Sequence, residues 1–248
     1  MDVTSANPKP KTFICVECGS YSALKFKKYP SGAIKLYQCV TCGDVVDKYI
    51  EYDSVMVLLD ILLHNSKAYR HVLFNVEVKV LRQLLVLSIL CDTYMRWAAF
   101  HQFCFDDSSL SNNWHLVLEL QFYKMLGISS LELCINICVT SVIVSFANRK
   151  KMSFSESFQS IPKSLLMSSY GKLLALAALV WNPDNSYWYL VLTKMFVITS
   201  NAEAIKVISH RTIAESVAYV ACGVLAGFLV QDYLLSTKLA DWQFTKPA

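Results

Sequence analysis

The spacing of hydrophobic and polar positions changes twice along the chain and divides it into three parts. Between residues 24 and 37, apolar and basic side chains alternate on both sides of Pro30-Ser31-Gly32, the pattern of two strands joined by a turn. Residues 55–63 are apolar on nearly every side of a helix, with Asp60 as the single charge. Long hydrophobic segments then fill the chain from residue 84 onward. The pattern predicts a β-hairpin, a short apolar helix and a membrane-embedded helical part.

Five hydrophobic segments predict a multi-pass α-helical membrane protein, because each approaches or exceeds the roughly 20 residues that span a bilayer. The first is marginal, because Asp92 and Arg96 lie inside it; they stand i,i+4 on one helical face and could pair. The last carries a small-residue face suited to close helix packing, formed by Ala218, Cys222 and Ala226. The segments are residues 84–100, 125–147, 165–181, 187–205 and 213–235.

Three polar residues, Glu132, Asn136 and Lys194, lie inside these segments. Polar groups in a bilayer are unfavourable unless they pair or line a cavity, so these residues are a functional lead. Structural hydrogen bonds between helices would explain them equally well.

Composition agrees with a membrane protein and argues against a nucleic-acid partner. The chain is 54% hydrophobic and 17% charged, and its mean hydropathy is +0.38. A net charge of +4 is too mild to imply nucleic acid. Residues 1–11 are polar, with two prolines and no apolar core of a cleavable signal, and are predicted to be disordered.

The charge of the loops predicts an orientation. Residues 148–151 and 206–211 are basic, so both belong on the cytosolic side. Residues 101–121 and the turn at 182–186 have no Lys or Arg and are predicted to be lumenal. With a reduced, cytosolic amino terminus, these assignments require five crossings and a lumenal carboxyl terminus.

Two C-x2-C-G motifs flank the predicted hairpin. Their four thiols, Cys15, Cys18, Cys39 and Cys42, can supply the corners of a tetrahedron around structural Zn²⁺. A closed four-cysteine site leaves no open coordination position, which indicates folding rather than catalysis. The hairpin between them predicts one basic face, suited to nucleic acid or to anionic lipid, formed by Lys25, Lys27, Lys28 and Lys35.

The apolar helix at residues 55–63 is too short to span a membrane. It either packs against the ribbon or lies in the membrane interface, and the amphipathic residues after it favour the interface at headgroup level. The candidate lipid-facing residues are Leu58, Leu59, Leu62, Leu63, Tyr69, Arg70 and His71.

One enzyme-like pattern is present. His101 and Asp106 match the H-x4-D spacing of glycerolipid acyltransferases, in which the aspartate orients a histidine base. The spacing is weak, since two common residue types recur by chance and no phosphate-binding block follows.

The amino-terminal part resembles the homology domain of the Arv proteins. The resemblance is carried by both cysteine motifs, by Asp47-Lys48-Tyr49-Ile50-Glu51-Tyr52-Asp53, and by Ala68-Tyr69-Arg70-His71-Val72-Leu73-Phe74-Asn75. It is dense over residues 15–75 and continues more weakly through Cys91-Asp92-Thr93-Tyr94-Met95-Arg96-Trp97. Together with the pattern it predicts a ribbon at 12–52, an interfacial helix and linker at 53–75, and a transmembrane bundle at 76–248.

The resemblance implies a non-enzymatic membrane protein of the endoplasmic reticulum, with the Golgi membrane as an alternative location and the zinc head in the cytosol. It implies sterol transport or distribution, with effects on sphingolipid metabolism; the partners would be membrane lipids, sterols and, alternatively, other membrane enzymes. An assembly factor for glycosylphosphatidylinositol-anchor synthesis and a lipid-modifying enzyme using His101 and Asp106 are the alternatives. Only the four cysteines carry over from the family as a site.

Overall fold

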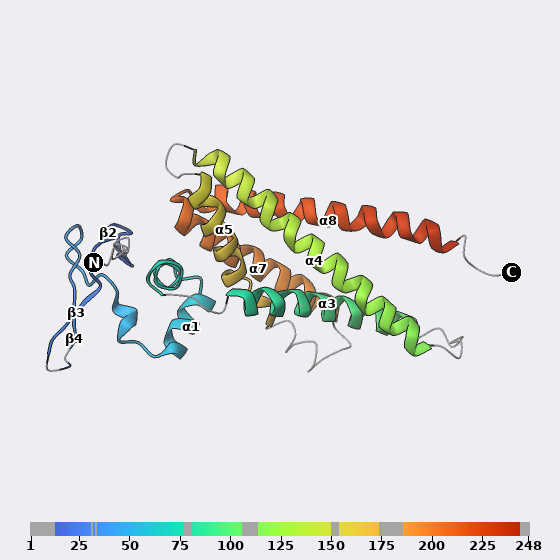
Figure 1. The fold of residues 1–248 in the computed structure, drawn as a ribbon, viewed down its shortest axis with the longest axis horizontal. Coiled ribbons are helices and arrows are strands. Elements are labelled where there is room, and N and C mark those ends of the chain that lie inside the picture. The colour runs from blue at the N-terminus through green and yellow to red at the C-terminus, as the bar shows by residue number, and fades with distance from the viewer. Residues whose placement is uncertain are drawn as a thin grey trace, which may run out of the picture. The chain divides into compact units, whose positions relative to one another are not determined.

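The chain folds into two compact units, Met1–Val78 and Lys79–Ala248, called here the head and the bundle. The computed structural model describes residues 13–30, 32, 34–76, 81–105, 114–149, 154–173 and 186–243 (Figure 1). The start at residues 1–11, predicted to be disordered, lies outside this range. The sequence placed the boundary after Asn75, three residues before the end of the head.

Two small antiparallel strand pairs form the first half of the head. Strand β1 (Phe13–Ile14) pairs with β2 (Tyr21–Ser22), and β3 (Phe26–Lys28) pairs with β4 (Ile34–Leu36). In the second pair Lys27 faces Lys35, which confirms the hairpin expected around Pro30-Ser31-Gly32. Strand alternation puts Lys28 on the opposite face, so the expected single basic face is only partly formed.

Short helices complete the head. They are η1 (Lys48–Ile50), α1 (Ser54–Leu62), α2 (Ser66–Arg70) and the π-helical turn η2 (His71–Asn75). Helix α1 confirms the helix expected at residues 55–63 to within one residue. Its N-cap is Asp53 as expected, although the side chain of Asp53 makes no capping hydrogen bond.

Long helices form the bundle. They are α3 (Leu81–Phe105), α4 (Trp114–Ala147), α5 (Phe154–Ser168), α7 (Ser186–Ser209) and α8 (Ile213–Gln243). Helices α4 and α8 lie side by side, and α5 packs between α4 and α7 (Figure 1). In the described part of the chain, two helical stretches are long and apolar enough to cross a membrane, Leu118–Ala147 and Ile213–Tyr233.

The third predicted segment, residues 165–181, is placed wrongly at its start. Helix α5 begins at Phe154 and ends at Ser168, so the helix covers only the first four residues of the expected segment. Turns follow at Ser169 and Tyr170 before the chain is helical again at 171–173. The serine-rich start of α5 was not recognised as helical from hydrophobicity, because its apolar residues are spaced to form one face of a helix and do not make a continuous apolar segment.

The interior of the bundle combines small polar residues with an apolar cluster, and its exterior is apolar. The buried cluster consists of Val144, Ile161, Leu165, Ile205 and Val220. Small or polar residues are buried in it, among them Ser129, Thr140, Ser141, Ser164, Ser168, Ser200, Ala202, Ala204 and Ser216. Large apolar residues are exposed, among them Leu120, Leu131, Phe146, Leu192, Met195, Leu225, Phe228 and Leu229. In both apolar stretches, Leu118–Ala147 and Ile213–Tyr233, only 22% of the most apolar window is buried, which is compatible with helices that face lipid. Small residues inside allow helix backbones to approach closely, as they do in membrane bundles.

The packing face of α8 differs from the one expected. Ala218 and Cys222 are exposed, whereas Gly223 and Gly227 are buried where α8 crosses α4. A Cβ atom at Gly223 would meet the side-chain oxygen of Asn136 at 2.9 Å and would also collide with the Thr140 hydroxyl. The two glycines, four residues apart, therefore set the close approach of the helices.

Asp92 and Arg96 of α3 pair with residues outside α3, so the expected Asp92–Arg96 pair is wrong. Arg96 forms an ion pair with Glu132 of α4. Asp92 accepts from the ammonium of Lys172 at 2.6 Å. Charges inside the bundle thus tie α3 to two other parts of it, which sequence spacing along a single helix could not reveal.

Candidate functional site

Two glycines shape the cysteine motifs into matching turns. Gly19 and Gly43 both have a φ of 79°, in the left-handed region that glycine adopts without strain. The Gly19 amide donates to the carbonyl of Cys15 at 2.9 Å, and the Gly43 amide donates to that of Cys39 at the same distance. The sequence predicted this conformation, and the turns bring both cysteines of each motif to one side.

The four sulfur atoms lie close enough to bind one metal ion, with all Sγ atoms within 4.8 Å of one another. The Sγ atoms of Cys15 and Cys42 are 3.7 Å apart, as are those of Cys18 and Cys39. Tetrahedral coordination with metal–sulfur bonds of about 2.3 Å requires roughly 3.8 Å between sulfurs. A disulfide requires about 2.05 Å, so the cysteines are free thiols. They could hold a metal ion, as a zinc ribbon does.

Hydrogen bonds prepare one side of this cluster to act as thiolate. The Ser20 hydroxyl lies 3.1 Å from the Cys39 sulfur, and together with the amides of Cys42 and Thr41 it lowers the pKa of Cys39 to about 5. The same hydroxyl lies 2.9 Å from Cys18, and its single proton can be donated to only one of the two sulfurs at a time. Hydrogen bonds from the Ser20 side chain and backbone lower the pKa of Cys18, whereas burial raises the pKa of Cys15. Thiolate is the form that binds metal.

A buried carboxylate joins the metal cluster to the end of the head. Asp47 is fully buried and contacts His71 Nδ1 at 2.8 Å. It also accepts from the Asn75 amide at 2.9 Å and the Tyr49 backbone N–H at 3.2 Å. Asn75 in turn bonds both the N–H and the carbonyl of Ile14, each at 2.9 Å. The π turn η2 thereby fastens to strand β1, next to Cys15.

Arg70 stabilises the first cysteine motif directly. Its guanidinium donates to the carbonyls of Val16 and Glu17 at 2.8 and 2.7 Å. It lies less than 4 Å from the position that a Cβ atom of Gly19 would take. The side chain therefore satisfies backbone acceptors of the turn that presents Cys15 and Cys18.

Helix α1 has one packed face and one exposed face. Val57 and Ile61 pack against a buried cluster of Val16, Tyr49 and Ala68. On the same side, the Tyr49 hydroxyl donates to Asp60 at 2.6 Å, which fixes the single charge of the helix.

The other face of α1 presents five large apolar side chains to the outside: Val55, Met56, Leu58, Leu59 and Leu63. Their exposure runs from 47% at Leu59 to 78% at Leu63, and Leu62 is half-buried. A contiguous exposed patch of this kind indicates contact with a membrane or a partner. These five residues are called the α1 patch below.

Comparison with known proteins identifies the family. The model of the Arv1-like family matches residues 14–205, most of the chain. Protein ARV1 of Bos taurus is 34% identical over 225 residues, which cover 89% of this chain and 77% of the relative. The chain belongs to the Arv1-like family.

Other Arv1-like relatives come from distant organisms. Protein ARV1 of Homo sapiens is 32% identical over 221 residues, covering 89% of this chain and 80% of the relative. Protein ARV 1 of Arabidopsis thaliana is 31% identical over 225 residues, covering 87% and 86%. No solved structure matches the chain.

The structure of this Arv1-like chain separates the expected lipid-facing residues into two groups. Leu58, Leu59 and Leu63 are exposed in the α1 patch. Tyr69 and His71 are buried, and Arg70 bonds the ribbon backbone, so placing these three at headgroup level was wrong. They follow α1 in sequence, but α2, which holds Tyr69 and Arg70, and the π turn, which begins at His71, place them in the head.

Two other pairs of residues complete the comparison with the sequence. Asp47 and Asn75 belong to the segments that resemble the family, but the periodicity of the sequence gave no sign that they are buried partners. The side chains of the possible catalytic pair, His101 and Asp106, lie outside the described part of the structure. At His101 only the backbone of α3 is described, and α3 ends at Phe105.

Proposed function

We propose that this protein is a non-enzymatic membrane protein of lipid homeostasis in the endoplasmic reticulum, with the Golgi membrane as the alternative location. It would bind membrane lipids, distribute sterol within the cell and influence sphingolipid metabolism, in keeping with the resemblance to Arv proteins. Its head faces the cytosol and holds one structural Zn²⁺ at Cys15, Cys18, Cys39 and Cys42. Sulfur donors and tetrahedral spacing favour zinc over magnesium or calcium, which prefer oxygen.

The α1 patch is the observation that carries this proposal. A helix that packs Val57 and Ile61 inward and leaves five large apolar residues outside suits a membrane interface. The hairpin adds positive charge, since Lys27 and Lys35 face each other across β3 and β4. Apolar insertion combined with basic charge favours an anionic lipid surface over water.

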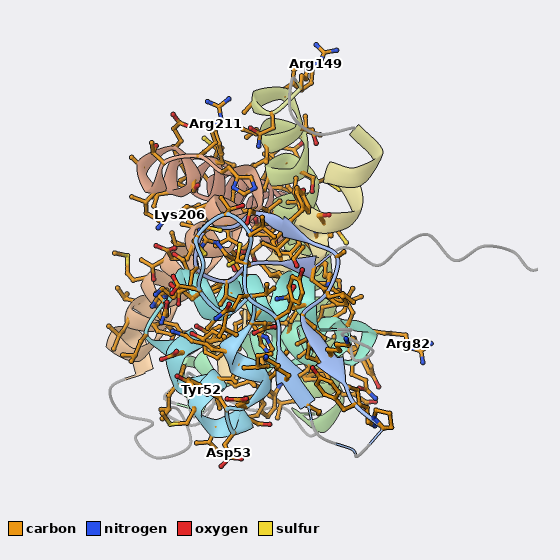
Figure 2. All side chains as sticks on the ribbon, turned by 90° about the vertical axis from the view of Figure 1, so that its left-hand side faces the viewer. Tyr52, Asp53, Arg82, Arg149, Lys206 and Arg211 are labelled. Atoms are coloured by element: carbon orange, nitrogen blue, oxygen red, sulfur yellow. The ribbon has the colours of Figure 1, made fainter. Side chains whose placement is uncertain are left out.

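Five membrane crossings agree with the placement of the basic loops within the bundle. The Arg211 guanidinium donates to the carbonyl of Ala147 at 2.7 Å and to Asn148 at 3.2 Å. These contacts bring the two basic loops together, and in Figure 2 Arg149 and Arg211 both project in the upper part of the view. Both basic loops were expected on the cytosolic side, and a shared end supports a common side of the membrane.

A substitution in the α1 patch tests the proposal in cells that lack their own family member. The full chain carrying Leu59→Asp places a carboxylate at acyl depth and should fail to restore the cellular distribution of sterol. The matched control, Tyr21→Asp, places the same carboxylate on an exposed aromatic of strand β2 and should restore it. Zinc content and expression of both variants should equal those of the wild type.

Rescue by Leu59→Asp as complete as by the wild type would remove the lipid-facing role of α1. The same assay with His101→Ala distinguishes a non-enzymatic lipid carrier from an enzyme that uses His101 as its base. Undiminished rescue is expected from a non-enzymatic protein, whereas an acyltransferase would lose its base.

A further inference from the structure

The bundle contains a cavity of about 140 Å³ between its helices. That is roughly ten times the volume that one ordered water needs. Its lining is mixed: apolar side chains such as Leu133, Ile137, Val197 and Val224 form its walls, and charged, amide and hydroxyl side chains lie between them. The space suits a polar group that enters from an apolar surrounding.

Five charged residues line this cavity, and four of them form two ion pairs. Arg96 pairs with Glu132, and Lys172 pairs with Asp92 at 2.6 Å. Among the residues that the structure describes, no carboxylate pairs with the fifth, Lys194 of α7. Two pairs cancel, so the cavity carries one surplus positive charge, at Lys194.

The surroundings of Lys194 are apolar and exposed. Leu192 and Met195 flank it on α7 and are 68% and 59% exposed, and Leu225 and Leu229 of α8 are exposed to a similar degree. Phe228, which lines the cavity, is also exposed. Lys194 is itself exposed, so the cavity opens on this face of the bundle. Where a bilayer covers the face, a lone ammonium is unfavourable without an anion.

We propose that this cavity binds the phosphate group of an anionic membrane lipid, with Lys194 as its counter-charge. The acyl chains would lie along Leu192, Met195, Leu225 and Leu229. This assignment rests on the proposed function in one respect, that the bundle lies in a membrane; the site is separate from the α1 patch. The surplus charge favours phosphate over the neutral hydroxyl of a sterol, and the apolar rim favours a lipid over free phosphate.

Lipid binding by the purified full chain in mild detergent tests the assignment. The probes are phosphatidic acid and phosphatidylcholine with identical acyl chains, and binding is read by native mass spectrometry and by the thermal stability of the chain. Phosphatidic acid should bind the wild type and raise its melting temperature, and phosphatidylcholine should not. Lys194→Gln should weaken phosphatidic acid binding about ten- to one hundred-fold, the range for loss of a charge-assisted contact.

Lys124→Gln is the matched control, because Lys124 is an exposed lysine of α4 outside the cavity lining. It should leave phosphatidic acid binding unchanged. A second variant covers the case in which Lys194→Gln fails to fold. Glu132→Gln frees Arg96 from its partner and raises the surplus charge, so it should tighten phosphatidic acid binding, whereas a purely structural role of Glu132 would weaken it.

Three outcomes would overturn the assignment. Equal binding by Lys194→Gln and wild type would mean that Lys194 extends to the membrane surface without a ligand. Equal binding of phosphatidylcholine would mean that charge is not recognised. If inorganic phosphate raises the melting temperature of the chain as much as phosphatidic acid does, the site binds a soluble anion. Leu59→Asp should leave this binding intact, so a failure here is distinguishable from a failure of the α1 patch.

Discussion

The head and the bundle of this Arv1-like chain differ in what they bury and in how much apolar surface they expose. The head buries apolar residues such as Val16, Val46 and Tyr49 around its sulfur cluster. The bundle buries serine, glycine and alanine beside an apolar cluster that includes Val144, Ile161 and Ile205, and it exposes leucine and phenylalanine. The exposed apolar stretches of α4 and α8 are compatible with membrane helices, and we propose that the bundle is suited to lipid and the head to water. The α1 patch exposes large apolar side chains as the bundle does, and we propose that the head meets lipid there.

The strongest test of this contrast removes the metal from the head. Cys39→Ser should abolish metal binding and unfold residues 13–76, because about 10 kcal/mol of binding free energy is folding free energy in small zinc domains. The bundle, which has its own core, should keep its helices. Elemental analysis and limited proteolysis of the full chain measure both effects.

Cys222→Ser is the control for this experiment, because Cys222 is an exposed thiol of α8. It should retain one Zn²⁺ per chain and a protected head. Unchanged zinc content in Cys39→Ser would exclude the four-sulfur site.

A smaller effect is expected from the buried carboxylate of the head. Asp47→Ala leaves His71, Asn75 and the Tyr49 amide without their acceptor and should destabilise the head by about 3 kcal/mol. Denaturant unfolding of a zinc-loaded fragment ending at Val78 measures the loss. Asp44→Ala, at an exposed carboxylate nearby, should change stability by less than about 0.5 kcal/mol. Similar losses in both variants would show that the Asp47 network contributes little.

The corresponding test in the bundle concerns close packing. Gly223→Val pushes two methyl groups toward Asn136 and Thr140 and should lower bundle stability by roughly 2 kcal/mol. Gly127→Val makes the same change on α4, where a Cβ atom would meet nothing within 4 Å, and should cost much less. Thermal unfolding in detergent compares them. Equal melting temperatures would mean that the packing of α4 against α8 does not require their close approach at Gly223.

The sequence predicted local features well and long-range partners poorly. The metal ligands, the hairpin and α1 could be predicted because each depends on spacing within a few residues. The side-chain partners of Asp47, the backbone partners of Arg70 and the lysine partner of Asp92 could not, because each lies at least 24 residues away in sequence. The buried face of α8 was misassigned for a related reason. Alanine and cysteine looked suitable for packing, but only the neighbouring helix determines which small residues it contacts.

The effect of salt on ion pairs compares the two units directly, and the change expected in the head is the smallest one predicted. In the head, Glu17 accepts from Lys48 at 3.2 Å and from Lys67, and all three side chains are partly exposed. Water and salt screen such pairs, so Glu17→Gln should cost about 0.5 kcal/mol at low salt and almost nothing at about 0.5 M salt. In the bundle, Asp92→Asn leaves Lys172 without its carboxylate, and Lys172 is only 13% exposed. We expect a larger loss there that does not change with salt, measured by thermal unfolding in detergent at both concentrations. If the Asp92→Asn loss also fades with salt, the cavity is freely hydrated, and the contrast between a water-adapted head and a lipid-adapted bundle would be weaker than the burial pattern implies.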